Sequence, residues 1–351
     1  MTWTMAPPRR CRWILFALLA WLIVGCAQPA APSAAPPSPG SGTAAAPAQP
    51  APSPAPQTMR ITIPAVAELG HAVLQLGVKN GYFAEEGLAP DFMLATGQIG
   101  IKALVAGEYD ASLAVGSATQ AILNGAPLKI AHVVVGRPLW WVYGRDPVRS
   151  LKDLQGRTLG VGAISDPSNV GTNLIMEKQG LDPRTVTAIA MGPPAQRYEG
   201  LLGGAVDAAV LILPDNLRAD DEGFHNLAAF ADYFQLAMTG MTVREDALAA
   251  KGPLLSAYMR AANKSIERFR ANKDEAVAAS VDVLQLSQAQ AERLHDELAA
   301  ALPKDGLVDQ DTQSTTIKMY GTAIEGIDPQ SIPLTKVFDL SLAERVASGA
   351  R

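Results

Sequence analysis

From Arg60 onward the chain alternates short apolar runs with stretches of helical periodicity, and this alternation limits its possible folds more than any other feature. RITIPAV, PDFML and DASLAV have the length of strands, whereas GHAVLQLGVKN and GIKALVAG between them have helical spacing. Ser117 is predicted to cap the helix that follows DASLAV. Strands and helices that alternate at this length predict an α/β fold with a parallel sheet and crossover helices.

The same order of elements returns about 97 residues later. RTLGVGA, TVTAIAM and VDAAVLIL are strand-like, and they alternate with helical SDPSNVGTNLIMEKQG and AQRYEGLLGG, the first with Pro167 near its first turn. The two halves share a local phrase, LVAGEYDA ending at Ala111 and LLGGAVDA ending at Ala208. This repetition predicts two similar, doubly wound α/β lobes that face each other across a cleft.

We expect the first lobe to comprise residues 59–142 and 240–351, and the second lobe residues 143–239. LWWVYGRDP and FQLAMTGMTVRED are interpreted as the extended crossings between them. After Pro253 the pattern is helical, and these C-terminal helices are expected to pack on the first lobe; Ser341–Glu344 has capping-box spacing. Ligands of open parallel sheets bind beyond the carboxyl ends of the strands, so closure of the cleft would surround a small molecule.

The first 25 residues have the pattern of a secretory signal: Arg9, Arg10 and Arg12 precede an apolar run that is short for a membrane span. Ile23-Val24-Gly25-Cys26 resembles a lipobox, in which cleavage precedes a cysteine that is then acylated. A chance cysteine after an ordinary signal, or an uncut anchor helix, is the alternative. Residues 26–58 are rich in Ala, Pro, Ser and Gly, a composition that predicts a disordered tether. We therefore expect a lipid-anchored body on the extracytoplasmic face of a membrane.

Composition limits the chemistry of that body. Without the signal's three arginines, 26 basic residues face 34 acidic ones, a net charge of −8 that argues against nucleic acid as a partner. The two cysteines, Cys11 and Cys26, both precede the predicted body, which therefore has no thiol nucleophile and no cysteine-based metal site. The histidines lack metal-ligand spacing, and no nucleophile elbow or P-loop occurs. We expect a monomeric binding protein with no metal, no cofactor and no catalytic residue.

Four stretches resemble a known family: GYFAEEGL, ALVAGEYDASLAVGSAT, LKDLQGRTLGVG and FRANKDEA. In this order they are similar to the nitrate/sulfonate/taurine and thiamine-pyrimidine-precursor substrate-binding proteins of ABC importers. The resemblance implies a type II periplasmic-binding-protein fold. It also implies capture of a small solute and its delivery to a membrane permease driven by a cytoplasmic ATPase.

In such proteins the loops that follow the strands touch the ligand. Backbone N–H groups at helix starts and nearby polar side chains make these loops suitable for binding, although each residue could equally be a helix cap. The predicted ligand-binding residues are Glu68, His71, Gly97, Gln98, Gly100, Ser117, Thr119, Trp140, Ser168, Asn169, Arg197 and Asp215.

The charges of these loops favour one ligand class slightly. Acidic residues outnumber the single Arg197, and Trp140 is close in sequence, so we expect a flat nitrogen heterocycle such as a pyrimidine or flavin precursor. An aliphatic sulfonate or nitrate is the alternative ligand. Two other classes are an accessory ligand sensor and a pyrimidine-synthase-like enzyme, the latter disfavoured because its chemistry depends on a cysteine-rich iron motif.

Overall fold

The computed structural model describes residues 55–64 and 69–349. The predicted signal, lipobox, most of the tether and Glu68 lie outside these residues. The described chain contains two five-stranded sheets. The first sheet comprises β1 (Gln57–Pro64), β2 (Leu88–Ala95), β3 (Ala111–Ala114), β4 (Leu128–Val135) and β10 (Thr239–Arg244). The second comprises β5 (Trp140–Gly144), β6 (Thr158–Val161), β7 (Thr187–Ala190), β8 (Ala208–Ile212) and β9 (His225–Ala229).

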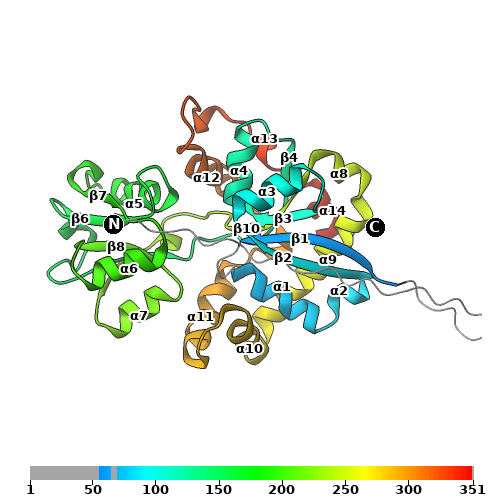
Figure 1. The fold of residues 1–351 in the computed structure, drawn as a ribbon, viewed down its shortest axis with the longest axis horizontal. Coiled ribbons are helices and arrows are strands. Elements are labelled where there is room, and N and C mark those ends of the chain that lie inside the picture. The colour runs from blue at the N-terminus through cyan, green and yellow to red at the C-terminus, as the bar shows by residue number, and fades with distance from the viewer. Residues whose placement is uncertain (1–54, 65–68, 350–351) are drawn as a thin grey trace, which may run out of the picture. The chain divides into compact units, whose positions relative to one another are not determined.

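Each sheet carries its own helices, and we call a sheet with its helices a lobe (Figure 1). The second lobe contains α5 (Pro167–Lys178), α6 (Pro194–Leu202) and α7 (Asp215–Asp221). The first lobe begins with α1 (Leu69–Lys79), α2 (Tyr82–Glu85), α3 (Gly97–Val105) and α4 (Val115–Leu123). It ends with α8 (Glu245–Ala250), α9 (Gly252–Ala271), α10 (Lys273–Leu284), α11 (Gln288–Ala301), α12 (Gln310–Gly321), α13 (Leu334–Val337) and α14 (Ser341–Ala347).

The two sheets have equivalent strand orders, β2-β1-β3-β10-β4 and β7-β6-β8-β5-β9. The first three strands of each order are parallel, as the sequence predicts. The predicted parallel arrangement does not extend to β10 and β5, which run antiparallel to both of their neighbours. Each of these strands arrives from the other lobe, so it enters its sheet at the edge where the parallel strands end. Thr239 accordingly pairs with Ala114, and Trp140 pairs with Ile212.

Local sequence accounts for many helix starts. Asp166 caps α5, because its Oδ1 accepts hydrogen bonds from the backbone N–H groups of Ser168 and Asn169, and Pro167 occupies the first turn as predicted. Ser287 and Gln290 form a reciprocal capping box at α11.

Two predicted caps are wrong. Helix α4 begins at Val115, directly after β3, so Ser117 lies within its first turn rather than at the cap. Helix α14 begins at Ser341 without a side-chain cap. There the Ser341 hydroxyl and backbone N–H both donate to Asp339, which precedes the helix, instead of forming the predicted box with Glu344.

The C-terminal helices pack on the first lobe, as predicted. Helix α1 contacts α9 and α10, α10 contacts α11, and α12 contacts α4. The two crossings between the lobes run side by side, since the backbone N–H groups of Leu236 and Met238 donate to Gly136 and Val135. None of the described helices is long and apolar enough to cross a membrane.

Candidate functional site

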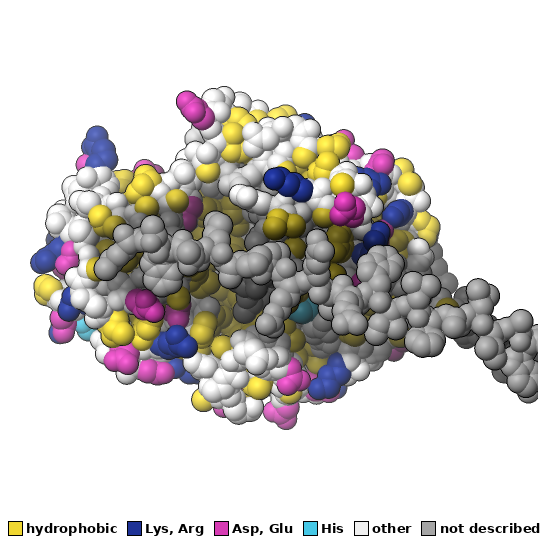
Figure 2. All heavy atoms as spheres, viewed as in Figure 1, with side chains coloured by type: hydrophobic (Ala, Val, Ile, Leu, Met, Phe, Trp, Pro, Cys, Tyr) yellow, Lys and Arg dark blue, Asp and Glu magenta, His cyan; other side chains and the backbone are white. Residues whose placement is uncertain are grey.

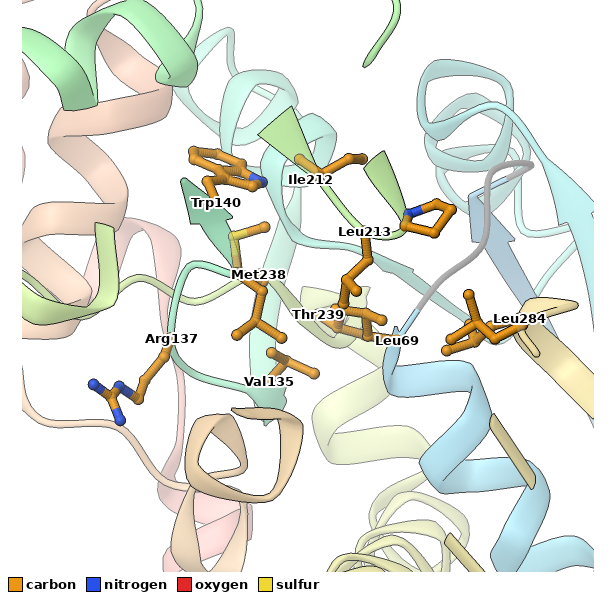
Figure 3. A pocket seen from close by; sticks show the side chains of 12 residues that line it. Leu69, Val135, Arg137, Trp140, Ile212, Leu213, Met238, Thr239 and Leu284 are labelled. Atoms are coloured by element: carbon orange, nitrogen blue, oxygen red, sulfur yellow. The ribbon is translucent and has the colours of Figure 1, made fainter. Parts of the chain in front are cut away.

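A cavity of about 170 Å³ lies where the two lobes and their crossings meet (Figure 3). The first lobe and the crossings contribute Leu69, Val135, Arg137, Leu139, Met238 and Thr239. The second lobe contributes Trp140, Ile212, Leu213 and Pro214, and the α10–α11 turn contributes Leu284 and Leu286. In the space-filling view, hydrophobic side chains gather in the recess between the lobes (Figure 2).

The cavity is largely apolar because, among the described residues that line it, only Arg137 and Thr239 have a charged or hydroxyl group, and neither presents that group prominently to the cavity. Figure 3 shows the Arg137 guanidinium directed away from the other lining side chains, and its Nη2 donates to the Ala231 carbonyl at 2.9 Å. Thr239 is 1% exposed. The remaining lining side chains are aliphatic, Pro, Met or Trp, so this part of the cleft is suited to an uncharged organic surface.

Trp140 is the predicted site residue that lines this cavity, among those the structure describes. It is the first residue of β5, and its ring packs edge-on against Phe230 with centroids 5.6 Å apart. This contact holds the indole in one orientation while the side chain stays partly exposed. Such an indole can offer both an aromatic face and an N–H donor to a ligand.

Among the described residues, those predicted on α1, α3 and α4 of the first lobe lie outside the cavity lining. The Nε2 of His71 is 2.8 Å from the Gln75 amide nitrogen, and burial lowers the pKa of this imidazole. The Thr119 hydroxyl donates to the Val115 carbonyl within its own helix. Gln98, at the start of α3, is exposed.

The two predicted glycines of α3 permit close packing. A Cβ on Gly97 would lie 2.3 Å from the Ser117 hydroxyl, and one on Gly100 would lie 2.6 Å from the Thr62 hydroxyl. Contacts this short mean that a side chain at either position would displace Ser117 or Thr62, so close packing is a sufficient reason for both glycines.

The predicted polar residues of the second lobe form a buried group near the start of α5. The Ser168 hydroxyl donates to Asp166, and the Asn169 amide donates to the Ile164 carbonyl at 2.7 Å. Arg197 is 6% exposed, its Nε has no hydrogen-bond partner within the described chain, and burial lowers the pKa of its guanidinium. The Asp166 and Asp215 carboxylates oppose that shift.

Asp215 connects this polar group to the cavity, because it directly follows the lining residue Pro214. Burial raises the pKa of its carboxyl group, and Arg218 lies 3.3 Å away on the same helix. The apolar cavity and the polar group are therefore adjacent in the chain at the start of α7.

The sequence reasoning missed the aliphatic lining residues. No polar group marks these residues as ligand contacts in the sequence: Leu69, Leu139, Met238, Leu284 and Leu286. The available signal was apolar residues at the breaks between elements, as in the LQLS stretch that begins with the last residue of α10. The described residues contain no group of three or more His, Cys, Asp or Glu side chains that could hold a metal ion.

Comparison with known proteins adds a family and a fold. Residues 68–276 match a family described as NMT1/THI5 like. Curated proteins give no match. The fold is similar to that of the periplasmic aliphatic sulphonate binding protein SsuA from Escherichia coli, with a TM-score of 0.61 and 15% identity over 76% of this chain and 86% of that one.

Two further solved structures share the fold. The periplasmic nitrate-binding protein NrtA from Synechocystis PCC 6803 has a TM-score of 0.62 and 13% identity, over 84% of this chain and 90% of that one. DszB in complex with biphenyl-2-sulfinic acid, an enzyme, has a TM-score of 0.60 and 15% identity over 83% and 99%. At these identities the likeness establishes the periplasmic-binding-protein fold, which confirms the predicted fold class.

Proposed function

Because this chain belongs to the NMT1/THI5-like family, we propose that it is a lipid-anchored, extracytoplasmic solute-binding protein that delivers a small organic solute to an ABC importer. The apolar cavity between the two lobes carries this proposal, since a solute held there contacts both lobes at once. Such a solute stabilises the arrangement in which both lobes touch it. The fold shared with sulphonate- and nitrate-binding proteins supports the same role.

We propose a nitrogen heterocycle, such as a pyrimidine or flavin precursor, as the preferred ligand. Trp140 would pack against the flat ring, and Asp215, next to the lining residue Pro214, would accept its N–H groups. An aliphatic sulfonate is the second candidate. Its chain would occupy the apolar cavity, and the buried Arg197 nearby in the second lobe favours an anionic end.

Titration calorimetry with aminopyrimidines, flavin precursors, alkanesulfonates and nitrate tests the ligand class. We expect an organic solute to bind and Trp140→Leu to weaken its binding at least about tenfold, because the indole contact is lost. The adjacent Trp141, which is buried outside this cavity, provides the matched control Trp141→Leu. Equal losses in both variants, or binding of nitrate alone, would contradict the proposal.

The proposed anchor and the proposed lack of turnover need separate tests. Cys26→Ala should move the protein from the membrane fraction to the soluble extracytoplasmic fraction, whereas an unchanged distribution would exclude lipidation at this position. Incubation with the identified solute should return it unchanged in stoichiometric amount. Steady consumption of the solute would instead indicate an enzyme.

A further inference from the structure

The turn between α10 and α11 closes one side of the apolar cavity. Leu284 is the last residue of α10 and Leu286 lies two residues later; both line the cavity, and they are 8% and 6% exposed. Figure 3 shows Leu284 and Trp140 on opposite sides of the lining side chains. The C-terminal helices thus supply a wall that faces the tryptophan of the second lobe.

An unusual backbone conformation places both leucines in this wall. Gln285, between them, has φ 55° and ψ 35°, in the left-handed region that residues with a Cβ seldom occupy. Its exposed side chain donates from Nε2 to the Asp282 carbonyl at 2.6 Å. The turn therefore directs one polar side chain outward and two leucines inward.

The rest of the structure fixes this turn relative to the second lobe. The capping box of Ser287 and Gln290 starts α11 directly after Leu286. One helical turn further on, Arg293 donates to Asp220 and Asp221 of α7, at 2.7 and 3.1 Å. The leucine wall is held by contacts at its own helix start and by ion pairs to the opposite lobe.

The match to the family covers residues 68–276, so Leu284 and Leu286 both lie beyond it. Their side chains offer no hydrogen bond, and any solute group placed against them must be apolar to gain from the contact.

We propose that Leu284 and Leu286 are specificity-determining residues that select solutes carrying an apolar segment opposite their polar end. This inference rests on the proposed solute-binding function. The wall accepts an alkyl or aryl segment of the solute, while the polar end lies toward the second lobe. A solute without such a segment gains no apolar contact with the leucines, and it binds more weakly for that reason.

Two homologous series of probes test the inference by calorimetry on the mature chain. One series is straight-chain alkanesulfonates from ethane- to octanesulfonate, and the other is 4-aminopyrimidines with 2-alkyl groups of the same lengths. In the unaltered protein, each methylene that enters the cavity should tighten binding up to about fourfold. In Leu284→Ala and Leu286→Ala that gain per methylene should fall, while binding of the shortest member changes less than about threefold.

Leu298→Ala provides the control, because Leu298 is a buried leucine of α11 that does not line the cavity. Thermal melting of all variants shows whether they are folded. The inference is wrong if the gain per methylene is the same in the unaltered protein and the two wall variants, or if Leu298→Ala reduces it equally. If no member of either series binds the unaltered protein, the inference fails, whereas the proposed function fails only if the wider set of organic solutes described above also does not bind.

Discussion

Replacing Arg293 should loosen the contact between the two lobes on the side of α11. Its guanidinium bridges α11 of the first lobe to Asp220 and Asp221 of α7 in the second. Asp220 also accepts a 2.6 Å hydrogen bond from the hydroxyl of Tyr143, a residue that is 1% exposed. Burial and this hydrogen bond raise the pKa of the Tyr143 phenol, so it remains a donor throughout the physiological range.

The expected magnitude is small because the ion pairs are exposed. The side chains of Arg293, Asp220 and Asp221 are 39%, 40% and 68% exposed, and pairs of this kind contribute about 0.2–1 kcal/mol each. Arg293→Met keeps the alkyl stem and should weaken the contact between the lobes by about 1 kcal/mol. The equilibrium between joined and separated lobes should then shift roughly fivefold toward the separated form. Because 1 M salt reduces the screening length to about 3 Å, most of this difference should disappear there.

A double-mutant cycle of Arg293→Met and Asp220→Asn, measured by urea unfolding at 0.05 and 1 M NaCl, gives the coupling energy. Spin labels on α5 and α9 would report the distance between the lobes in the same variants. We expect a coupling of about 0.5–1 kcal/mol at low salt and a broader distance distribution in Arg293→Met. A coupling near zero, or one that high salt leaves unchanged, would refute this account of the contact.

Three further perturbations test the packing. Burial lowers the pKa of His132 to about 4. The buried neutral imidazole therefore contributes up to about 3 kcal/mol to the free energy of unfolding above pH 6.5, and this contribution is lost as the pH falls toward 4. His132→Gln should flatten that part of the urea stability profile, and parallel profiles would contradict this. Gly77→Ala should destabilise by about 1–3 kcal/mol in the same assay, because its Cβ would lie 1.7 Å from the Ser265 hydroxyl. Adding Ser265→Gly should recover part of the lost stability, and an unchanged stability would show that the contact with Ser265 does not cause the loss. Gln285→Gly should raise the melting temperature slightly by removing a left-handed non-glycine residue. A lower melting temperature would show that the hydrogen bond from the Gln285 side chain to Asp282 stabilises the turn by more than the left-handed conformation costs.

The sequence predicted the parts of the fold that local patterns encode. The periodicity of GHAVLQLGVKN located α1 within one residue, and RITIPAV overlaps β1 over residues 60–64. The repeated phrases ending at Ala111 and Ala208 reflect two sheets of equivalent order. The antiparallel β10 was not predicted, because strand direction within a sheet depends on which lobe the chain has just left. Ser117 was wrongly predicted as a cap, because a polar residue in the first turn of a helix has the same sequence pattern as one at the cap position.

The candidate site was harder to predict than the fold. Trp140 was predicted from its aromatic side chain and lines the cavity, while its contact with a ligand remains a prediction. Leu284 and Leu286 line the cavity although they lie about 140 residues after Trp140 in the chain. No local sequence pattern indicates that these residues are close to Trp140. The predicted contacts at Ser168, Asn169 and Arg197 remain predictions.

The exchange of β5 and β10 between the sheets sets the order in which a nascent chain can complete them. The second sheet uses residues 140–229 without interruption, so it can assemble as soon as that segment is free. The first sheet begins earlier in the chain, yet it lacks the strand between β3 and β4 until residue 244 has been made. The half that starts first must therefore finish last, and until then its unpaired strands are exposed to misassembly.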